Sequence, residues 1–248
     1  MKSAPVPDVH TFANGVKVCG YQLLQVQRDR YAARNVHEAE EEDLFVEAVA
    51  GIPPNGCYVS VGSAIGYYPI LTRRLRPDVM IHCFEPLRSH RAFFVENIAL
   101  NGLRQDDFAI HPQAVAGETG TAILIDESYA SHLALDGDQA RLAGDTRASS
   151  VAAVALGDVF RVCGIEVIDL IQFDIQGLEA LVLHEYFRTM SACSCGRIDA
   201  FVIGTHGARV HEQCESLLRT HGYAIRWSQA VGVAQPDGIL VASRPSGS

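Results

Sequence analysis

The chain has 248 residues, 48% of them hydrophobic and 20% charged, with a formal net charge of −9. This composition excludes an intrinsically disordered protein and is sufficient for one α/β domain with a substantial core. An acidic chain argues against a nucleic-acid partner, which normally requires a basic face. No segment approaches the roughly 20 apolar residues of a membrane span, so we also expect no membrane partner.

The chain contains 7 cysteines, none of them in a C-x-x-C pair. An odd number of cysteines in an enzyme-sized chain without a secretory signal favours reduced thiols. We therefore expect a cytoplasmic protein. The sequence leaves the oligomeric state open, a homo-oligomer included.

Residues 1–36 form an N-terminal extension ahead of the main domain, which we place at residues 37–248. Within the extension, Val16–Val26 alternates like a strand and Gln25–Arg34 is polar enough for a helix. Its place before the main domain leaves two interpretations, a cap over an acceptor site or a simple packing arm.

The main domain begins with a predicted helix from His37 to Ala50, which has apolar side chains on one face and ends at Gly51. Acids crowd its first turns, where the helix dipole favours them. We interpret the acidic run Glu38–Asp43 as the solvated face and N-terminus of this helix.

The segment that organises the chain is a buried strand, Tyr58–Val61, which breaks into a turn containing Gly62, Ser63 and Gly66. Glycines at such a turn bring bare backbone close to a bound nucleotide. The spacing lacks the second glycine of the dinucleotide pattern G-x-G-x-x-G, and no Lys-Ser or Lys-Thr follows it. Nicotinamide dinucleotides are therefore disfavoured, and a P-loop is excluded.

The second predicted strand, Met80–Phe84, ends in Glu85 and Pro86 about 20 residues after the glycine turn. A carboxylate at that place in a doubly wound sheet accepts hydrogen bonds from both ribose hydroxyls. S-adenosylmethionine has a ribose and no phosphate, so it suits this looser turn better than a dinucleotide does. Gly62, Ser63, Gly66, Glu85 and Pro86 are the predicted cofactor-binding residues here.

A third strand is predicted over Phe108–Val115, and Gln113 and Ala114 at its end are expected to lie beside the adenine ring. Residues 126–149 have no clean periodicity, and we expect an acceptor lid there. Tyr129 and His132 are its candidate substrate-binding residues, together with Arg147.

Further strands are predicted over Val167–Asp174 and Ile198–Gly204, with Tyr223–Trp227 and Gly238–Ala242 as a closing pair. The alternation of strands and helices predicts an α/β fold with a mostly parallel, doubly wound sheet and an antiparallel closing strand. Ligands of such sheets bind at the carboxyl ends of the strands.

Two polar residues at adjacent strand ends, Asp174 and His206, are the candidate catalytic groups. Methyl transfer from a sulfonium requires in-line placement and removal of the nucleophile's proton. With the ordinary histidine pKa near 6.5, His206 is expected to be the general base and Asp174 its positioning partner, which also borders the cofactor. Gln176 and Glu179 follow as candidate substrate-binding residues.

Five motifs in order, from about Glu38 to the C-terminus, resemble those of the FkbM-type S-adenosylmethionine-dependent methyltransferases. They are Ser60–Tyr68, Phe84–Pro86, Glu96–Gly102, Asp169–Glu179 and Phe201–His206. The resemblance implies a Rossmann-like class I methyltransferase fold. It also implies O-methylation of a small-molecule hydroxyl, on a sugar or on a glycosylated or polyketide natural product.

The chain departs from this family at four positions. Ser60 replaces the usual Asp, Gln172 the usual Lys, Gln176 a frequent Glu, and Gly204 the usual Glu. These departures keep in view a catalytically inactive partner subunit that binds cofactor. A second alternative is an N-methyltransferase of a small molecule, which would also work with a histidine or aspartate nearby. Related sugar methyltransferases use magnesium, for which Asp174, Glu179 and His206 offer ligands. The metal stays unassigned.

Overall fold

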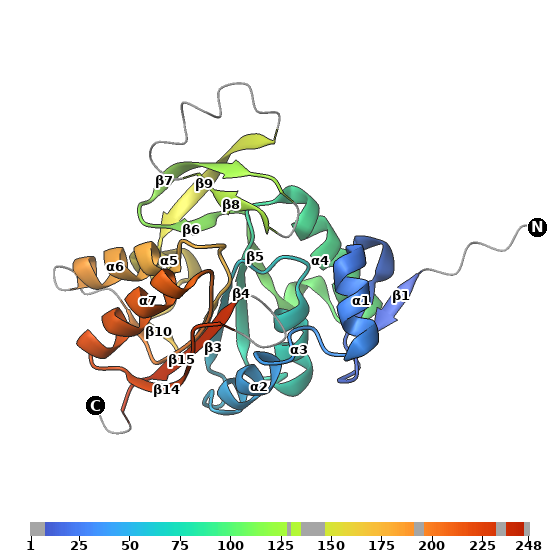
Figure 1. The fold of residues 1–248 in the computed structure, drawn as a ribbon, viewed down its shortest axis with the longest axis horizontal. Helices are drawn as coiled ribbons and strands as arrows, with labels where there is room; N and C mark the ends of the chain where they lie inside the picture. Colours follow the sequence, from blue (N-terminus) through green and yellow to red (C-terminus); the bar gives the residue numbers. More distant parts are fainter. Residues whose placement is uncertain (1–7, 128–129, 135–146, 191–195, 232–236, 246–248) are drawn as a thin grey trace, which may run out of the picture.

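The centre of the molecule is a seven-stranded sheet in the order β14-β15-β13-β11-β3-β4-β5 (Figure 1). The computed structural model describes residues 8–127, 130–134, 147–190, 196–231 and 237–245. All neighbouring strands run parallel except at β15, which is antiparallel to both β13 and β14. The predicted doubly wound sheet with an antiparallel closing strand is confirmed. Its strands are β3 (Cys57–Val61), β4 (Met80–Phe84), β5 (Ala109–His111), β11 (Leu170–Phe173), β13 (Ala200–Thr205), β14 (Ala224–Gln229) and β15 (Gly238–Ser243).

The first strand, β3, shows why the sheet is covered on both faces. All five of its residues are buried, and alternate side chains enter two different apolar clusters. Cys57, Val59 and Val61 join one cluster and Tyr58 joins the other. Successive side chains of a strand point to opposite faces, so a continuously apolar strand requires helices on both sides.

In the described part of the chain, helices pack on both faces of the sheet. The cluster that holds Tyr58 includes side chains of α2 (Glu42–Ala50), α3 (Tyr67–Leu75) and α4 (Arg88–Leu100). The cluster that holds Val59 includes α5 (Leu156–Cys163), α6 (Glu179–Met190) and α7 (Ala208–Thr220). Figure 1 shows these groups on opposite sides of the central strands. No helix in the described residues is long and apolar enough to cross a membrane.

A second sheet, of four strands in the order β6-β9-β7-β8, lies beyond the end of β5 (Figure 1). Its strands are β6 (Ala114–Ala116), β7 (Gly120–Ile125), β8 (His132–Leu133) and β9 (Ala148–Ala155). The single third strand predicted over residues 108–115 is therefore wrong. It divides after His111 because Pro112 has no backbone N–H to continue the ladder. β5 stays in the central sheet, and β6 pairs with β9 instead.

The predicted lid, residues 126–149, falls partly in this second sheet. Its described residues include strand β8 and the start of β9, which pair with opposite edges of β7 at its C-terminal end. Residues 128–129 and 135–146 lie outside the described residues. The lid stays a prediction.

The N-terminal segment packs against the main domain. It comprises β1 (Val9–Thr11), β2 (Lys17–Cys19), the short 3-10 helix η1 (Gly20–Gln22) and α1 (Gln25–Ala33). Phe12, Val18 and Tyr31 belong to the same apolar cluster as α3 and α4. The segment therefore shares its core with the domain that follows it.

The fourth and fifth strands begin later than the sequence predicts. Two short strands, β10 (Val167–Ile168) and β12 (Arg197–Ile198), pair with each other outside the central sheet. Asp169 separates β10 from β11, and its side chain accepts a hydrogen bond of 2.7 Å from the Cys57 amide. A further 3-10 turn, η2 (Gln105–Asp107), precedes β5.

Candidate functional site

The register of the central sheet brings three predicted site residues to one level. Val61 is paired with Phe84 on one side and with Phe173 on the other. The residues that follow these three are Gly62, Glu85 and Asp174. They therefore leave the carboxyl ends of β3, β4 and β11 side by side, where ligands of such sheets bind.

Both predicted turn glycines have a backbone that favours glycine. Gly62 has φ 80° and Gly66 φ 84°. A Cβ at Gly62 would lie 1.9 Å from the carbonyl oxygen of Asp174, and one at Gly66 would lie 1.9 Å from the Phe94 ring. Neither site has room for a side chain, so the first glycine lets β3 and β11 approach and the second lets α3 start against α4.

Glu85 stabilises the glycine turn as well as facing the cavity. Its side chain is buried. Oε2 accepts a hydrogen bond of 2.8 Å from the Ala64 amide, and Oε1 accepts one of 2.9 Å from the Leu87 amide. A carboxylate has about four lone-pair positions. Two are used by these amides, and His90 Nδ1 lies 3.6 Å from Oε1, beyond hydrogen-bond distance, which leaves two for the paired hydroxyls of a ribose.

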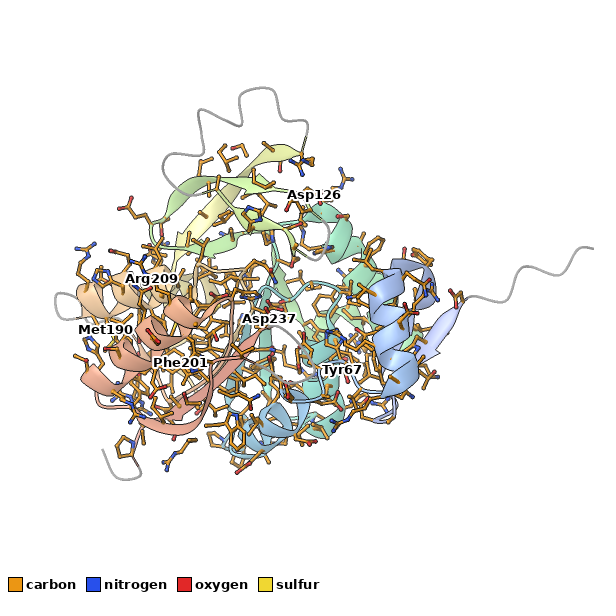
Figure 2. The ribbon with its side chains drawn as sticks, in the orientation of Figure 1. Tyr67, Asp126, Met190, Phe201, Arg209 and Asp237 are labelled. Carbon is orange, nitrogen blue, oxygen red and sulfur yellow. The ribbon has the colours of Figure 1, made fainter. Side chains whose placement is uncertain are left out.

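A cavity of about 260 Å³ lies over these strand ends, close to the lower end of the size range of small-molecule sites. Four carboxylates line it, against one arginine, Arg30. Figure 2 shows one of the four, Asp237, near the middle of the molecule, in front of the central strands. The carboxylates come from Glu38, Glu85, Asp174 and Asp237. The cavity is therefore acidic, and it favours a cationic ligand over an anionic one.

Most of the predicted binding residues lie at this cavity. Its lining includes Gly62, Ser63, Glu85, Pro86, Ala114, Asp174, Gln176 and His132. Gly66 acts through the turn, and Gln113 is half-buried beside Ala114 without being part of the lining. Val115 and Phe84, which the sequence analysis did not select, add apolar surface next to Ala114. Tyr129 lies outside the described residues, and Arg147 pairs with Glu127 at 2.6 Å.

The two candidate catalytic residues are in contact, with Asp174 Oδ1 3.4 Å from His206 Nε2. Only Asp174 lines the cavity, where its side chain is 40% accessible. His206 lies behind it, with Nδ1 2.7 Å from Glu179 Oε1 and Nε2 3.8 Å from Asp237 Oδ1. The structure thus places Asp174, and not His206, where it can meet an acceptor.

Glu179 is a positioning residue for this pair. Its side chain is fully buried, and it accepts hydrogen bonds from the amides of Ile175 and Gly177 as well as contacting His206. It is absent from the lining of the cavity. The structure therefore does not bring Glu179 to the substrate, because its carboxylate is occupied in holding the loop after β11.

The pKa values of the pair are both raised. Burial raises the pKa of Asp174 to about 7, with Glu38, Glu179 and Asp237 adding to the effect and His206 opposing it. The Asp174 side chain is 40% accessible at the cavity, so solvent there screens part of these effects. Burial alone would lower the pKa of His206. The hydrogen bond to Glu179 and the charges of Asp174 and Asp237 outweigh burial and raise this pKa to about 9.

The expectation of a histidine that titrates near 6.5 is therefore wrong. Near neutral pH His206 is an imidazolium, which cannot accept a proton, whereas Asp174 titrates in the neutral range. The sequence analysis grouped Asp174 and Glu179 with His206 but missed Asp237, which lies just before β15 and more than 30 residues further along the chain.

Asp174, Glu179 and His206 do not form a metal centre. The two carboxylates contact opposite nitrogens of one imidazole, Glu179 at Nδ1 and Asp174 at Nε2. Three ligands of one ion must converge on a common point. These three lie in a row, which suits charge stabilisation and not magnesium binding.

The acidic run ahead of α2 is not a solvated helix face, and this part of the sequence interpretation is wrong. The helix begins at Glu42, and both Glu41 and Glu42 are buried. Glu42 accepts a hydrogen bond of 2.5 Å from the Tyr67 hydroxyl, and Glu38 accepts one of 2.8 Å from the Tyr68 hydroxyl at the cavity wall. These side chains turn inward because tyrosines at the start of α3 supply donors for them.

Glu41 faces two of the positions where the chain departs from the FkbM pattern. Its Oε1 accepts a hydrogen bond of 2.8 Å from the side-chain amide of Gln172. Its Oε2 lies 3.5 Å from the position that a Cβ on Gly204 would occupy. Burial, followed by the charges of Glu38 and Asp174, raises the pKa of Glu41 well above its usual range. The segment before α2 thus places a carboxyl beside Gly204 on β13.

The strand order and the position of the cavity define the class I methyltransferase fold. Numbered along the chain, the central strands run 3-2-1-4-5, as in the doubly wound nucleotide-binding sheets, and an antiparallel seventh strand lies between the fifth and the sixth. The fold expected from the sequence is confirmed.

No family model matches the chain, and no curated protein matches it in sequence. Similar solved structures include the precorrin-6y C5,15-methyltransferase of Geobacter metallireducens, at 11% identity and TM-score 0.46, covering 86% of this chain and 91% of that one. TrmK of M. capricolum, solved with S-adenosyl-homocysteine, has 10% identity and TM-score 0.48, with coverages of 81% and 67%. A ribosomal protein L11 methylase from Lactobacillus delbrueckii has 13% identity and TM-score 0.46, with coverages of 84% and 79%. At these values the activities of those proteins are not transferred to this chain.

Proposed function

We propose that the protein is an S-adenosylmethionine-dependent O-methyltransferase that acts on a hydroxyl of a small molecule. The observation that carries this proposal is the acidic cavity at the ends of β3, β4 and β11, with Glu85 held at the ribose position. S-adenosylmethionine carries a positive sulfonium and no phosphate. Its charge suits a cavity with four carboxylates and one arginine, whereas the pyrophosphate of a dinucleotide would be repelled there.

The residues that would hold the cofactor divide by chemistry. Glu85 offers its two remaining lone-pair positions to the ribose hydroxyls. Phe84, Ala114 and Val115 offer apolar surface to the adenine ring. The cofactor supplies an electrophilic methyl group, and the protein has to align an acceptor with it and remove the acceptor's proton.

Asp174 is the proposed proton acceptor. It lines the cavity, its pKa of about 7 matches a general base at neutral pH, and it is in contact with a protonated His206. The imidazolium stabilises the carboxylate form before the reaction, and Glu179 fixes the ring from the other side. His206 is then a positioning residue, although His206 as the base remains a distinct outcome of the experiments below.

The acceptor is proposed to be a small molecule with an apolar portion. Leu24 and Val26 are exposed by 44% and 69% at the cavity, although both are apolar. His132 on β8 and Arg30 on α1 add polar groups to the same lining. A sugar or a glycosylated or polyketide natural product of the kind handled by FkbM-type enzymes combines hydroxyls with apolar surface in this way.

Membership of the FkbM family is part of the proposal. Its five motifs fall at the β3 turn, the end of β4, the end of α4, the loop after β11 and the end of β13, and all five contribute to the site or its support. The α4 motif contributes through Asn97, which donates a 3.0 Å hydrogen bond to the Ile65 carbonyl behind the glycine turn.

Calorimetry with S-adenosylmethionine, S-adenosylhomocysteine and NAD tests the cofactor. We expect micromolar binding of the first two and none of the third. Transfer of a labelled methyl group to a panel of hydroxyl and amine acceptors then tests the reaction. Tight NAD binding would contradict the proposal, N-methylated products would reassign the acceptor, and cofactor binding without any transfer would favour an inactive subunit.

A further inference from the structure

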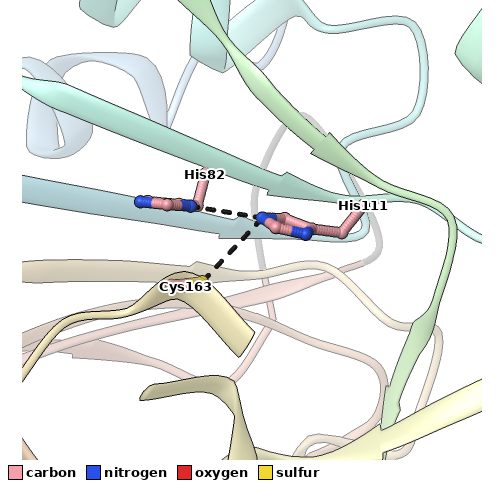
Figure 3. A group of neighbouring side chains, drawn as sticks. All are labelled: His82, His111 and Cys163. Atoms are coloured by element: carbon pink, nitrogen blue, oxygen red, sulfur yellow. Dashed lines mark hydrogen bonds between the residues drawn. The ribbon is translucent and has the colours of Figure 1, made fainter. Parts of the chain in front are cut away.

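A second cluster of chemically reactive side chains lies away from the cavity, between the sheet and α5. It consists of His82 on β4, His111 at the end of β5, and Cys163 at the end of α5, and all three are half-buried (Figure 3). One ligand atom from each lies within 4.8 Å of the other two. None of the three residues lines the cavity.

The contacts within this cluster converge on one atom. His111 Nε2 lies 3.2 Å from His82 Nδ1 and 3.9 Å from Cys163 Sγ. A single ring nitrogen has one lone pair or one N–H, so it cannot make a good hydrogen bond with both neighbours at once. Figure 3 shows the two contacts meeting at the His111 ring. A cation among the three atoms would satisfy them all.

The distances suit a tetrahedral ion. Zinc binds histidine nitrogen at about 2.0–2.1 Å and cysteine sulfur at about 2.3 Å. Tetrahedral angles then place two nitrogens about 3.3 Å apart, and a nitrogen and a sulfur about 3.6 Å apart. The observed 3.2 Å and 3.9 Å differ from these by a few tenths of an ångström.

We propose that His82, His111 and Cys163 form a zinc site. Imidazole and thiolate are the ligands that zinc prefers, and neither suits magnesium or calcium. The described residues supply three ligands, so one coordination position is left for water or an added ligand.

The site would link elements that are distant in sequence. It joins the edge of the central sheet to the C-terminal end of α5 (Figure 3). The His111 ring also stacks on Phe84, with ring centroids 4.5 Å apart, and Phe84 lines the cavity. Zinc at the cluster would therefore hold one wall of the cavity in place without touching its ligand.

The test uses the full chain, freed of metal by a chelator and titrated with Co²⁺, whose bond to a thiolate absorbs in the near ultraviolet. We expect this absorption to saturate at one Co²⁺ per chain and to disappear on adding one equivalent of Zn²⁺. Zn²⁺ should also raise the melting temperature. If the parent protein shows no stoichiometric Co²⁺ or Zn²⁺ binding, the proposal is wrong, whatever the variants do.

Variants locate the ion. Cys163→Ser should abolish the thiolate absorption and weaken binding by more than the 10–100-fold typical of changes around a ligand. His82→Asn should weaken binding and keep the absorption. Cys19→Ser, a half-buried cysteine on β2 outside the cluster, should change neither. An unchanged cobalt spectrum in Cys163→Ser would place the ion elsewhere and overturn the proposal.

Discussion

The Gln172 side chain on β11 donates a 2.8 Å hydrogen bond to the carboxyl of Glu41, from the segment ahead of α2. The oxygen of the same side-chain amide accepts a hydrogen bond of 2.6 Å from the Tyr58 hydroxyl on β3. Gln172, which stands where the FkbM pattern has lysine, is uncharged. Its partner Glu41 is uncharged as well, because the raised pKa of Glu41 keeps that carboxyl protonated.

Glu41→Gln should make the protein less sensitive to alkaline pH. A carboxyl with a raised pKa in the folded state stabilises the fold below its unfolded pKa, near 4.5, and loses that contribution as pH rises through its folded pKa. Thermal unfolding should show similar stability of parent and variant at pH 4.5, with the variant increasingly the more stable above it. Glu212→Gln, at an exposed position on α7, is the control, and a parallel pH dependence of parent and Glu41→Gln would refute the assignment.

Glu85→Gln should weaken cofactor binding. The amide keeps the shape of the carboxylate, but its nitrogen cannot accept from the Ala64 or Leu87 amides or from a ribose hydroxyl. Hydrogen bonds to charged groups contribute about 1.5–3 kcal/mol, which corresponds to a loss of roughly 10- to 150-fold in affinity. Calorimetry with S-adenosylhomocysteine measures it, with Glu212→Gln again as control. An affinity within threefold of the parent's would exclude Glu85 from the ribose site.

The pH dependence of the reaction should separate Asp174 from His206 as the base. With Asp174 as acceptor, kcat/KM rises with pH through about 7, and with His206 it rises through about 9. Initial rates from pH 5.5 to 10 with one confirmed acceptor decide between them.

Substitutions sharpen that comparison. Asp174→Asn should lower the rate by about 10²–10⁴-fold at every pH. His206→Asn removes the charge that opposes the rise of the Asp174 pKa, so the ascending limb should move to higher pH and most of the rate should return there. A His206→Asn enzyme that stays inactive at high pH, with cofactor affinity intact, would restore His206 as the base.

Gly62→Ala should destabilise the protein more than Gly102→Ala. Both glycines have positive φ, 80° and 70°, but only at Gly62 would a Cβ meet backbone, at 1.9 Å from the Asp174 carbonyl oxygen. A non-glycine residue in this region costs about 1–2 kcal/mol, and overpacking adds about 1–3 kcal/mol. Urea unfolding should therefore give about 1–2 kcal/mol for Gly102→Ala and about 2–5 kcal/mol for Gly62→Ala. Equal losses would show that the close approach is relieved at no cost.

The sequence was sufficient for the parts of the site that are local. The strand ending at Val61, the glycine turn and Glu85 are specified by residues within one β-α-β unit, where apolar runs and glycines carry the signal. The antiparallel closing strand was also predicted, because Gly238–Ala242 reads as a separate apolar run at the end of the chain.

The sequence was insufficient where a side chain depends on a distant partner. An acidic run resembles a solvated helix start, and only Tyr67, Tyr68 and Gln172, all more than 20 residues away, turn Glu38, Glu41 and Glu42 inward. The cluster of His82, His111 and Cys163 escaped notice for the same reason, since its members are 29 and 52 residues apart.

Helix α1 and the residue before it contribute side chains both to the core and to the rim of the cavity. Tyr31 is buried in the core, whereas Val26, together with Leu24 just before the helix, is exposed at the rim of the cavity. A change at either rim position leaves the core packing untouched. On the proposed function, the range of accepted molecules can therefore be changed at these two positions with little loss of stability, whereas exchanging the whole N-terminal segment would remove Phe12, Val18 and Tyr31 from the core.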